Sequence, residues 1–583
     1  MKDERGNTKT IGLMIEDINS DFSKEIIYSI QNTISSNKNL RLVVIAGKYN
    51  ESDEIYDKWQ HYRIVYNSIF RIEELCQFDG LIISLSSIGQ RKVKTLDTQA
   101  FEVFTDLPKV YIASNLEEVI SVNYDNEIGI REAVDYLVNV NGVKKLCMLG
   151  GRENNVDAVE RKRCFIKCLE ENRIEFSEEL YEATDMSPHT KEAAARLLDR
   201  NPGTQAVFCV NDSVAVGLYE VMKERGMTPG KELVVFGFDN TYRASEMNPP
   251  LASIGCSSLT LGQKALELLI TMIGGTEVSS AKIPTRLYGR ESLPYEMYEY
   301  TVREMVNIDP DFIYRMFDDC FYRYGNREYD RESVNLKRLY FEFIYRMLAA
   351  AKRRFMGLEE FNEVGRMIDI FFDNGALAYT DAAKLLNRIE KLQYGINLMN
   401  PSVSSNVMIN RLFVRMKDRA IQALSNELTK TKREEVVNRS LKQTFLIEST
   451  VFNESEKGTV DSVIKGFSCL GLRNAALYLY EAPIVYEYKK MDGFPKTVRL
   501  RCAIKDGEVY VPSKERQSYR IADIFRNEKR PFSGNGYVVF PVFYGTVIYG
   551  FLLCELTYGI SDRGEEISNL LGGVVYINIG RGD

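Results

Sequence analysis

Two aspartates stand at matching places in the stretch VNDSVAVGLYEVMKERGMTPGKELVVFGFDN, residues 210–240. Asp212 follows one apolar run and Asp239 follows the next, and the segment between them has the length and periodicity of one helix. The carboxyl ends of parallel strands meet at one edge of a sheet, so both carboxylates are expected there. Carboxylate oxygens at such an edge can accept hydrogen bonds from the hydroxyl groups of a sugar or a nucleoside.

Further polar residues take corresponding places along the first half of the chain. They are Asp17 and Asn19 after the first apolar run, Asp125 and Asn126 before a helical segment, and Asn211 beside Asp212. Arg161 can add a forked pair of N–H donors. Asp and Asn are also preferred helix N-caps, each worth about 1 kcal/mol, so capping alone can explain any single one of them. Several at one sheet edge favour a binding site for a small polar ligand.

The sequence offers little for catalysis or for a metal. No phosphate loop, nucleophile elbow or Ser/His/Asp order accompanies the carboxylates, and acid–base catalysis needs groups that converge on one bond. The ten cysteines include no CxxC pair and the only histidines are His61 and His189, which predicts neither a disulfide framework nor a zinc site. Cys164 and Cys168 share a helix face, where two small, half-buried residues are the simpler explanation. We therefore expect no enzyme activity and no cofactor.

Charge and hydropathy restrict the partners. The formal net charge of −7 leaves no basic excess for phosphate contacts, so no direct DNA binding is expected. No run approaches the roughly 18 apolar residues of a membrane span, and the start MKDERGNTKT lacks the apolar centre of a secretory signal. We expect a cytoplasmic protein that does not contact the membrane.

The elements that must position the polar side chains follow from the apolar pattern. Over residues 1–293, runs such as TIGLMIED, LRLVVIAG and LVVFGFDN alternate with amphipathic segments, which is typical of parallel strands covered on both faces. Roughly 300 residues of this pattern exceed one domain of ordinary size and predict two α/β lobes.

The next part of the chain is predicted to be helical. Residues 294–404 carry aromatic and Met side chains at helical spacing, which indicates an all-helical connector held by packing. In residues 405–444 apolar side chains recur every three or four residues, at Ile409, Phe413, Met416, Ala420, Leu424 and Leu428. This spacing predicts a signalling coiled coil and hence a homodimer. The alternative is a solvated helix that packs on a neighbour.

Residues 445–583 mix helical segments with runs such as TVRLRCAIK, so an α+β unit is expected. Tyr544, Gly545 and Thr546 supply a turn between two strands of a hairpin. The second of these strands alternates poorly, which predicts that it is buried on both sides.

The first unit resembles a known family. The segments VNYDNEIGIREAVDYLVNVNGVKKLCMLGG, ERKRCF, CVNDSVAVG, LVVFGFDN, PPLASIGCSSLTLGQKALELLI and GRES are similar, in this order, to the ligand-binding domain of the LacI/GalR family. The resemblance spans residues 10–292 and implies a two-lobed type I periplasmic-binding-protein fold that holds a small polar metabolite, such as a sugar, between its lobes. By matching motif, the ligand-facing residues would be Asp125, Arg161, Asn211 and Asp239, with Asp17, Asn19 and Phe22 lining the crevice from the other lobe.

The sequence departs from this family in several places. Its first strand is predicted from Thr10, which leaves no room for the family's N-terminal helix-turn-helix. Cys164 replaces a usual glycine, and Met186 stands where the family often has an aromatic that stacks on a sugar ring. The ligand class therefore stays open, and a ligand-free dimerising scaffold is an alternative.

The last unit is similar to a GAF domain over GYVVFPVFYGTVIYGFLLCELTYGISDRGEEISNLLGGVV. It has neither a cyclic-nucleotide signature nor a bilin-attachment Cys-His pair, so both a dimerising role and a second ligand stay open. The order of units resembles the sensory half of bacterial GGDEF diguanylate cyclases. The segment DRGEEIS, residues 562–568, lacks the glycine turn of a GGDEF loop.

Together these features predict a sensor. A small polar solute would close the two lobes, and a homodimer held by the coiled coil and the GAF-like domain would pass the change on. The alternatives are the regulatory part of a GGDEF diguanylate cyclase whose catalytic domain lies outside this chain, and a regulator of transcription that acts through a partner.

Overall fold

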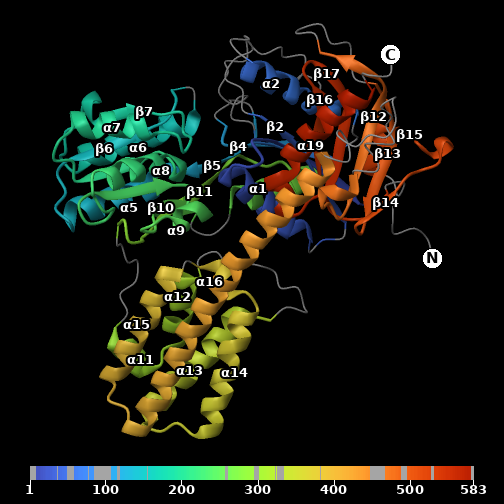
Figure 1. Cartoon of the computed structure of the whole chain (residues 1–583). Helices are drawn as coiled ribbons and strands as arrows, with labels where there is room; N and C mark the ends of the chain where they lie inside the picture. The colour runs from blue at the N-terminus through green and yellow to red at the C-terminus, as the bar shows by residue number, and fades with distance from the viewer. Residues whose placement is uncertain are drawn as a thin grey trace.

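The fold is seen in a computed structural model of the chain. It describes residues 8–35, 37, 39–48, 58–75, 78–84, 107–114, 119–153, 155–256, 260–293, 301–321, 324, 334–380, 382–446, 467–486, 495–526 and 531–579. These residues form two α/β lobes, a helical bundle and a C-terminal α+β unit (Figure 1).

The first lobe is a parallel sheet with helices on both faces. Its strands run in the order β2-β1-β3-β4-β5, with bounds β1 (Lys9–Glu16), β2 (Leu40–Gly47), β3 (Gly80–Ser84), β4 (Lys109–Ile112) and β5 (Ser121–Asp125). Helices α1 (Asp21–Ser35) and α10 (Leu261–Ile273) pack together on one face, while α2 (Lys58–Tyr66) and η2 (Asn67–Leu75) lie on the other. Strands β1, β2 and β3 are almost wholly buried, which explains their continuous Val/Ile/Leu runs.

The second lobe repeats this plan. Its strands run in the order β7-β6-β8-β9-β10-β11, with bounds β6 (Leu146–Gly150), β7 (Tyr181–Ala183), β8 (Ala206–Cys209), β9 (Val234–Phe238), β10 (Ala252–Cys256) and β11 (Ala281–Tyr288). The helical elements are α5 (Asn126–Asn139), α6 (Val156–Glu171), η3 (Glu178–Leu180), α7 (Lys191–Arg200), α8 (Asp212–Glu224) and α9 (Tyr242–Glu246).

Three crossings of the chain connect the lobes. The chain passes from β5 into α5 at Asp125, and from β10 in the second lobe to α10 against the first. Strand β11 serves both sheets, because Pro284 pairs with Asp125 of β5 whereas Thr285 pairs with Cys256 of β10. The predicted two-lobed α/β fold is confirmed over about half of the chain.

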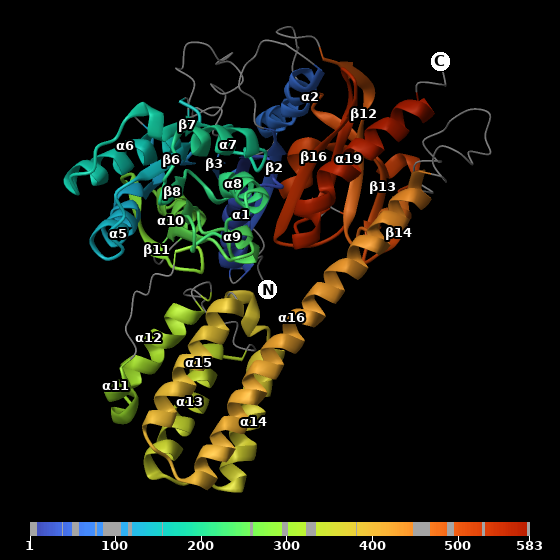
Figure 2. The same cartoon turned by 60° about the vertical axis from the view of Figure 1, so that its left-hand side comes forward.

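Six further helices form a bundle around an aromatic core. They are α11 (Val302–Asn307), α12 (Pro310–Cys320), α13 (Leu336–Arg353), α14 (Leu358–Asp373), α15 (Ala382–Leu398) and α16 (Val403–Leu446), with the short turn η4 (Ala376–Tyr379) before α15. Tyr340, Phe343 and Met347 of α13 are buried in its core, as their helical spacing indicates. Helix α16 leaves the bundle and reaches the C-terminal unit as a single rod (Figure 2).

The first half of the predicted coiled-coil seam is packed inside this bundle. Ile409, Phe413, Met416 and Ala420 of α16 are buried in the bundle core, and α16 packs on α13, α14 and α15 of the same chain. Expecting these four residues to meet a second copy was wrong, because three neighbouring helices already cover that face. The side chains of Leu424 and Leu428 lie outside the described residues.

The C-terminal unit is an antiparallel sheet with helices against it. It comprises η6 (Ser468–Leu470), β12 (Ala475–Val485), β13 (Thr497–Lys505), β14 (Glu508–Tyr510), η7 (Lys514–Arg516), β15 (Ser518–Arg520), α18 (Ile521–Arg526), β16 (Gly536–Tyr544), β17 (Val547–Glu555) and α19 (Tyr558–Ile579). Gly545 has φ 57° in the turn between β16 and β17, as expected for the hairpin. Strand β17 is buried on both faces, which accounts for its poor alternation.

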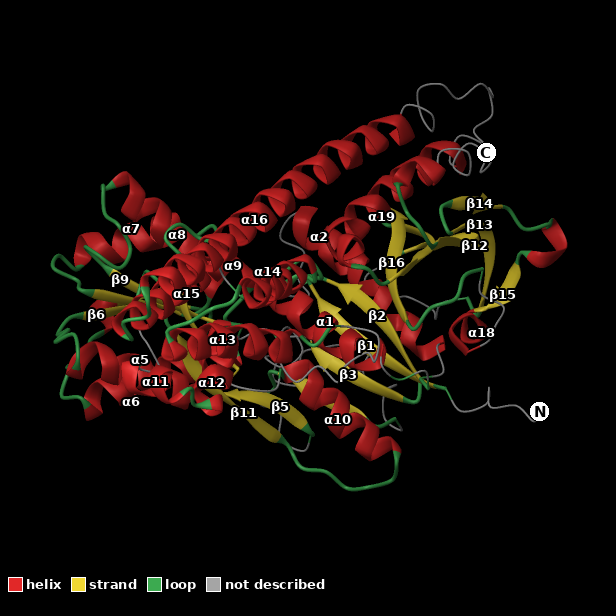
Figure 3. Cartoon of the chain, turned by 90° about the horizontal axis from the view of Figure 1, so that it is seen from below, coloured by secondary structure: helices red, strands yellow, loops and turns green. Residues whose placement is uncertain are grey.

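This unit is joined to the first lobe by a shared sheet. Strand β16 pairs in parallel with β2, with Tyr537 opposite Val43 and Val539 opposite Ile45. The sheet therefore continues from β5 through β2 into β16, β17, β12 and β13. The view from below shows β2 beside β16 (Figure 3). Side chains of both parts also share hydrophobic clusters on the two faces. Among the helices of the described segments, none is long and apolar enough to cross a bilayer.

Two neighbouring residues of α16 test the intramolecular packing. Phe413 is 0% exposed and Val414 is 55% exposed. Phe413→Ala should lower the free energy of unfolding by about 3–5 kcal/mol because it leaves a cavity in the bundle core, whereas Val414→Ala should change it by at most about 0.5 kcal/mol. Urea unfolding of the full chain measures both. Equal losses for the two variants would show that Phe413 does not lie in a core.

Candidate ligand-binding site

Arg161 lies at the centre of a buried polar network in the second lobe. It projects from α6 and is 2% exposed. Its Nε donates to Asn126 Oδ1 at 3.2 Å, one Nη donates to the Val210 carbonyl at 2.7 Å, and the other donates to Asp239 Oδ1 at 2.9 Å. The guanidinium thus connects α5, the end of β8 and the end of β9, all at the edge of the sheet that faces the first lobe.

The surroundings of Arg161 explain why its charge can be buried. The guanidinium lies 3.7 Å from the centre of the Phe238 ring, and Asp239 supplies the opposite charge. Burial raises the pKa of the Asp239 carboxyl, and the Arg161 guanidinium opposes that shift. All three of the nitrogen groups of Arg161 are used within the protein, so it holds other residues in place.

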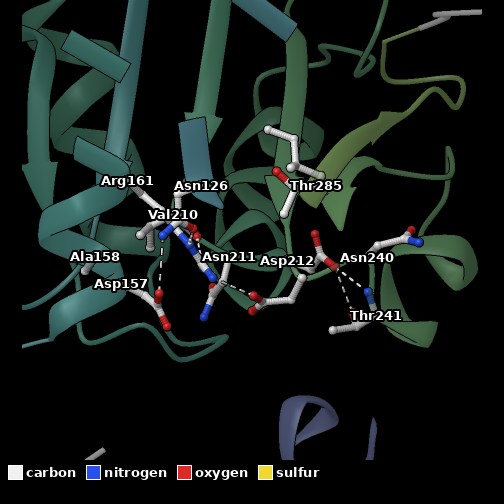
Figure 4. Close-up of polar contacts among 12 residues, drawn as sticks. Asn126, Asp157, Ala158, Arg161, Val210, Asn211, Asp212, Asn240, Thr241 and Thr285 are labelled. Carbon is white, nitrogen blue, oxygen red and sulfur yellow. Dashed lines mark hydrogen bonds and ion pairs between the residues drawn. The ribbon is translucent and has the colours of Figure 1, made fainter. Parts of the chain in front are cut away.

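Asp157 and Asn126 extend the network towards the space between the lobes. Asp157 stands four residues before Arg161, on the same face of α6, and its Oδ1 accepts from Asn126 Nδ2 at 3.4 Å. Figure 4 shows Asp157, Asn126, Arg161 and Asn211 gathered at this edge. Asp157 is only half-buried.

The Asp212 carboxylate is hydrogen-bonded within the second lobe. Its carboxylate accepts from the Thr241 backbone N–H at 2.7 Å, the Thr241 hydroxyl at 2.9 Å and the Ser253 hydroxyl at 2.5 Å. Burial, with the nearby charge of Asp239, raises the pKa of the Asp212 carboxyl to about 7 although these donors favour its ionised form. One of the two matching aspartates therefore ties α8 to the loop after β9.

Asp239 is held in a conformation that costs backbone energy. Its φ is 93° and that of Asn240 is 49°, a region that side chains other than glycine rarely adopt. Arg161 fixes the Asp239 side chain, and Arg290 donates to Asn240 Oδ1 at 2.7 Å. These bonds position the turn after β9. In this turn Asp239 is 9% exposed and Asn240 is half-buried.

Asn211 caps α8. Its Oδ1 accepts from the Val214 backbone N–H at 2.9 Å, and its Nδ2 donates to the Met186 carbonyl at 3.2 Å. The capping explanation for this residue therefore holds, and its half-exposed amide also lies at the lobe edge beside Asp157.

Asp125 makes no side-chain cap at the start of α5. It borders a shallow hollow along the outer turns of α5, together with Glu127, Ile128, Arg131, Glu132 and Asp135. Its backbone carbonyl accepts from the Thr285 hydroxyl at 2.6 Å, which fixes a crossing between the lobes. The neighbouring Asn126, rather than Asp125, reaches Arg161.

The three first-lobe residues that were predicted to line the crevice contact other parts of the protein. Lys48 pairs with Asp17 Oδ1 at 3.3 Å, Asn19 Nδ2 donates to Glu565 at 3.1 Å, and Phe22 packs against the hydrophobic core. The structure therefore gathers Arg161, Asn211 and Asp239 at one edge, whereas Asp17, Asn19 and Phe22 are bound to the first lobe and to α19. Their contact with a ligand stays a prediction.

Sequence reasoning overlooked two features of this edge. Asp157 could have been found from its four-residue spacing to Arg161, which puts both on one helical face. The ion pair between Arg243 Nε and Asp21 Oδ2, 2.7 Å long, joins α9 of the second lobe to α1 of the first. No spacing in the sequence indicates that pair, because it depends on how the lobes meet.

These features define a two-lobed α/β domain of the periplasmic-binding class, with a polar network at the edge between its lobes. The family model described as a periplasmic binding protein-like domain matches residues 134–293. The transcriptional repressor PurR of Vibrio atlanticus is 25% identical over 272 residues, which cover 46% of this chain and 75% of that protein.

Two more relatives are regulators by name. Catabolite control protein A of Priestia megaterium is 25% identical over 295 residues, 49% of this chain and 82% of its own length. The regulator CelR of Thermobifida fusca is 30% identical over 179 residues, 30% of this chain and 52% of its own length. A solved complex of CelR with cellobiose has 22% identity and a TM-score of 0.41, covering 49% of this chain and 85% of that one.

Removing Asp239 should destabilise the fold. Asp239→Ala leaves the Arg161 guanidinium buried without its carboxylate, and removing one partner of a buried ion pair costs about 3–5 kcal/mol. Arg163→Ala is the control, since its pair with Glu160 is largely exposed and should contribute at most about 1 kcal/mol. Urea unfolding measures both losses. A loss no larger for Asp239→Ala than for Arg163→Ala would contradict the burial of this charge.

The stability contributed by Asp212 should fall as the pH rises. Its pKa is raised from 3.8 to about 7 in the folded chain, so between these values the folded state keeps a proton that the unfolded chain has released. The contribution is complete below about 4 and is lost as the pH rises through about 7. The wild-type unfolding free energy minus that of Asp212→Asn, from urea titrations, should therefore decrease across this range. A difference that grows with pH would contradict the shift.

Proposed function

We propose that this chain is a signal transduction protein that senses a small polar solute between its two α/β lobes. The observation that carries the proposal is the buried network of Arg161, Asn126 and Asp239, which holds acceptor groups at the lobe edge. The matched family model over residues 134–293 and the regulators named above support the same function.

The chemistry of the edge favours a ligand with hydroxyl or amine donors. The half-buried groups there are Asp157, Asn211 and Asn240. The Asp157 carboxylate accepts one bond from Asn126, and each amide oxygen accepts one bond, from Val214 or Arg290, so all three keep room for a further donor. A sugar-like solute fits this set, because each of its hydroxyl groups can donate to one oxygen.

A second candidate function is control of transcription through a partner. It is favoured by the relatives that are named as a transcriptional repressor and a transcriptional regulator. Solute sensing is common to both candidates, so the same ligand experiment applies to them. A GAF-mediated homodimer, a link to a diguanylate cyclase and a ligand-free scaffold stay predictions.

A thermal-shift screen of the full chain against sugars, nucleosides and amino acids tests the proposal. A solute that binds the folded state should raise the melting temperature by several degrees once its concentration exceeds Kd by about 100-fold. Asp157→Asn should weaken that solute by about tenfold or more, since one charged acceptor, worth about 1.5–3 kcal/mol, becomes neutral.

The control is Glu220→Gln, an equivalent change at an exposed residue of α8. It should leave both the melting temperature and the affinity unchanged. If no solute in the library shifts the melting temperature, or if Asp157→Asn binds as well as the wild type, the interlobe site does not have the function proposed here.

A further inference from the structure

Glu565 of α19 is held by three separate elements of the first lobe. Its carboxylate accepts from Lys48 at the end of β2 at 2.6 Å, from Asn19 in the loop after β1 at 3.1 Å and from the Tyr62 hydroxyl of α2 at 3.1 Å. The Lys48 and Glu565 side chains are only 16% and 14% exposed, so this ion pair is shielded from water. A carboxylate with three such donors has one well-defined position.

Aromatic side chains pack against the residues that hold Glu565. Phe543 of β16 lies 5.6 Å from the Tyr62 ring and 5.9 Å from the Tyr66 ring, measured between centroids. Tyr66 is fully buried beneath Lys48. Packed aromatic side chains leave little freedom for the groups above them, so a movement at one end of the contact is transmitted to the other.

The segment 17–21 connects this contact to the second lobe. Asp17 pairs with Lys48 at 3.3 Å and Asn19 binds Glu565, so one end of the segment is tied to α19. Two residues further on, Asp21 accepts from Arg243 of the second lobe at 2.7 Å. Segment 17–21 therefore contacts the C-terminal unit through Asn19 and the second lobe through Asp21.

The C-terminal unit is fixed to the first lobe independently of α16. Beside the β2–β16 pairing, α1 binds α19 through Tyr28 to the Ser561 hydroxyl at 2.9 Å and Lys24 to Asp562 at 2.6 Å. Gln31 of α1 also donates to the carbonyl of Leu556, between β17 and α19, at 2.8 Å. On the side of α16, Lys442 pairs with Glu566, the residue next to Glu565. Glu565 therefore contacts the first lobe, whereas the adjacent Glu566 contacts α16.

We propose that Glu565 is the positioning residue that couples the interlobe site to the C-terminal unit through segment 17–21. Opening or closing of the lobes changes the Asp21–Arg243 pair, shifts Asn19 and Asp17, and so changes how Lys48 and Asn19 hold Glu565. Because α19 packs on β16, the C-terminal sheet receives the change directly. The coupling rests on the proposed function, because a bound solute is the signal that would change the lobes. The contact between Glu565 and segment 17–21 is present without a ligand.

Hydrogen exchange of the full chain without ligand tests the contact. The Asp17 amide is bonded to the Gly47 carbonyl at 3.0 Å and the Ser20 amide to the Asp17 carbonyl at 2.7 Å, so both report on segment 17–21. Glu565→Gln keeps the shape and removes the charge that Lys48 pairs with. Glu565→Gln should speed hydrogen exchange at these two amides by about tenfold through local opening. Asn19→Ala removes the other partner of the same hydrogen bond and should also speed their exchange.

Glu566→Gln is the matched control. It removes the pair with Lys442 and should leave exchange in segment 17–21 within about twofold of the wild type. Unchanged exchange in Glu565→Gln and in Asn19→Ala, or equal acceleration in Glu566→Gln, would overturn the coupling.

A ligand arm separates this inference from the proposed function. With a solute found by the thermal-shift screen, residues 558–569 of α19 should gain protection in the wild type and in Glu566→Gln, and should gain at least about threefold less in Glu565→Gln. Equal protection in all three proteins would overturn the coupling. If no solute binds while Glu565→Gln still loosens segment 17–21, the contact stands and the proposed solute sensing fails.

Discussion

The structure depends on one strand pairing, that between β2 and β16. Strand β2 is the outer strand of the first lobe's parallel sheet, and an unpaired outer strand exposes a row of backbone N–H and carbonyl groups. Strand β16 satisfies that row from within the same chain, with Leu42 N donating to the Asn535 carbonyl at 2.7 Å at the start of the ladder. The first lobe and the C-terminal unit consequently share a sheet.

This arrangement changes how a signal can travel. A helical rod between two independent domains would transmit only rotation or bending of α16. Here α16 is anchored by Ile409 and Phe413 in the bundle and by Phe445 in the core of the C-terminal unit. The shared sheet and α19 offer a shorter route from the interlobe edge to the C-terminal unit.

The interlobe edge itself is organised around a buried charge. Each of the three guanidinium nitrogens of Arg161 already donates one hydrogen bond within the protein, to Asn126, Val210 and Asp239. Its role is therefore to position the acceptors around it, and the positive φ of Asp239 is sustained by that bond. Pre-positioned acceptors lose little conformational freedom when a solute binds, which favours affinity.

The local sequence was sufficient for the elements and for part of the site. Val/Ile/Leu runs between amphipathic segments predicted the two α/β lobes, because strands buried on both faces need apolar side chains on both. The order of polar residues after strands predicted that Asn211 and Asp239 share one edge, and the resemblance to a known family added Arg161. The turn at Gly545 also followed, since a hairpin turn with positive φ favours glycine.

Long-range packing decided the remainder. The stripe of Ile409, Phe413, Met416 and Ala420 has the same spacing whether it meets another chain or the helices of its own bundle, so periodicity could not choose between them. Whether Asp212 binds a solute or ties Thr241 and Ser253 depends on a loop contact that no motif records. The sequence by itself determined which segments become strands and helices and where polar groups follow them. Only the tertiary structure decided which of those groups remain accessible and that β16 completes the sheet of the first lobe, because both depend on contacts between residues that are tens to hundreds of positions apart.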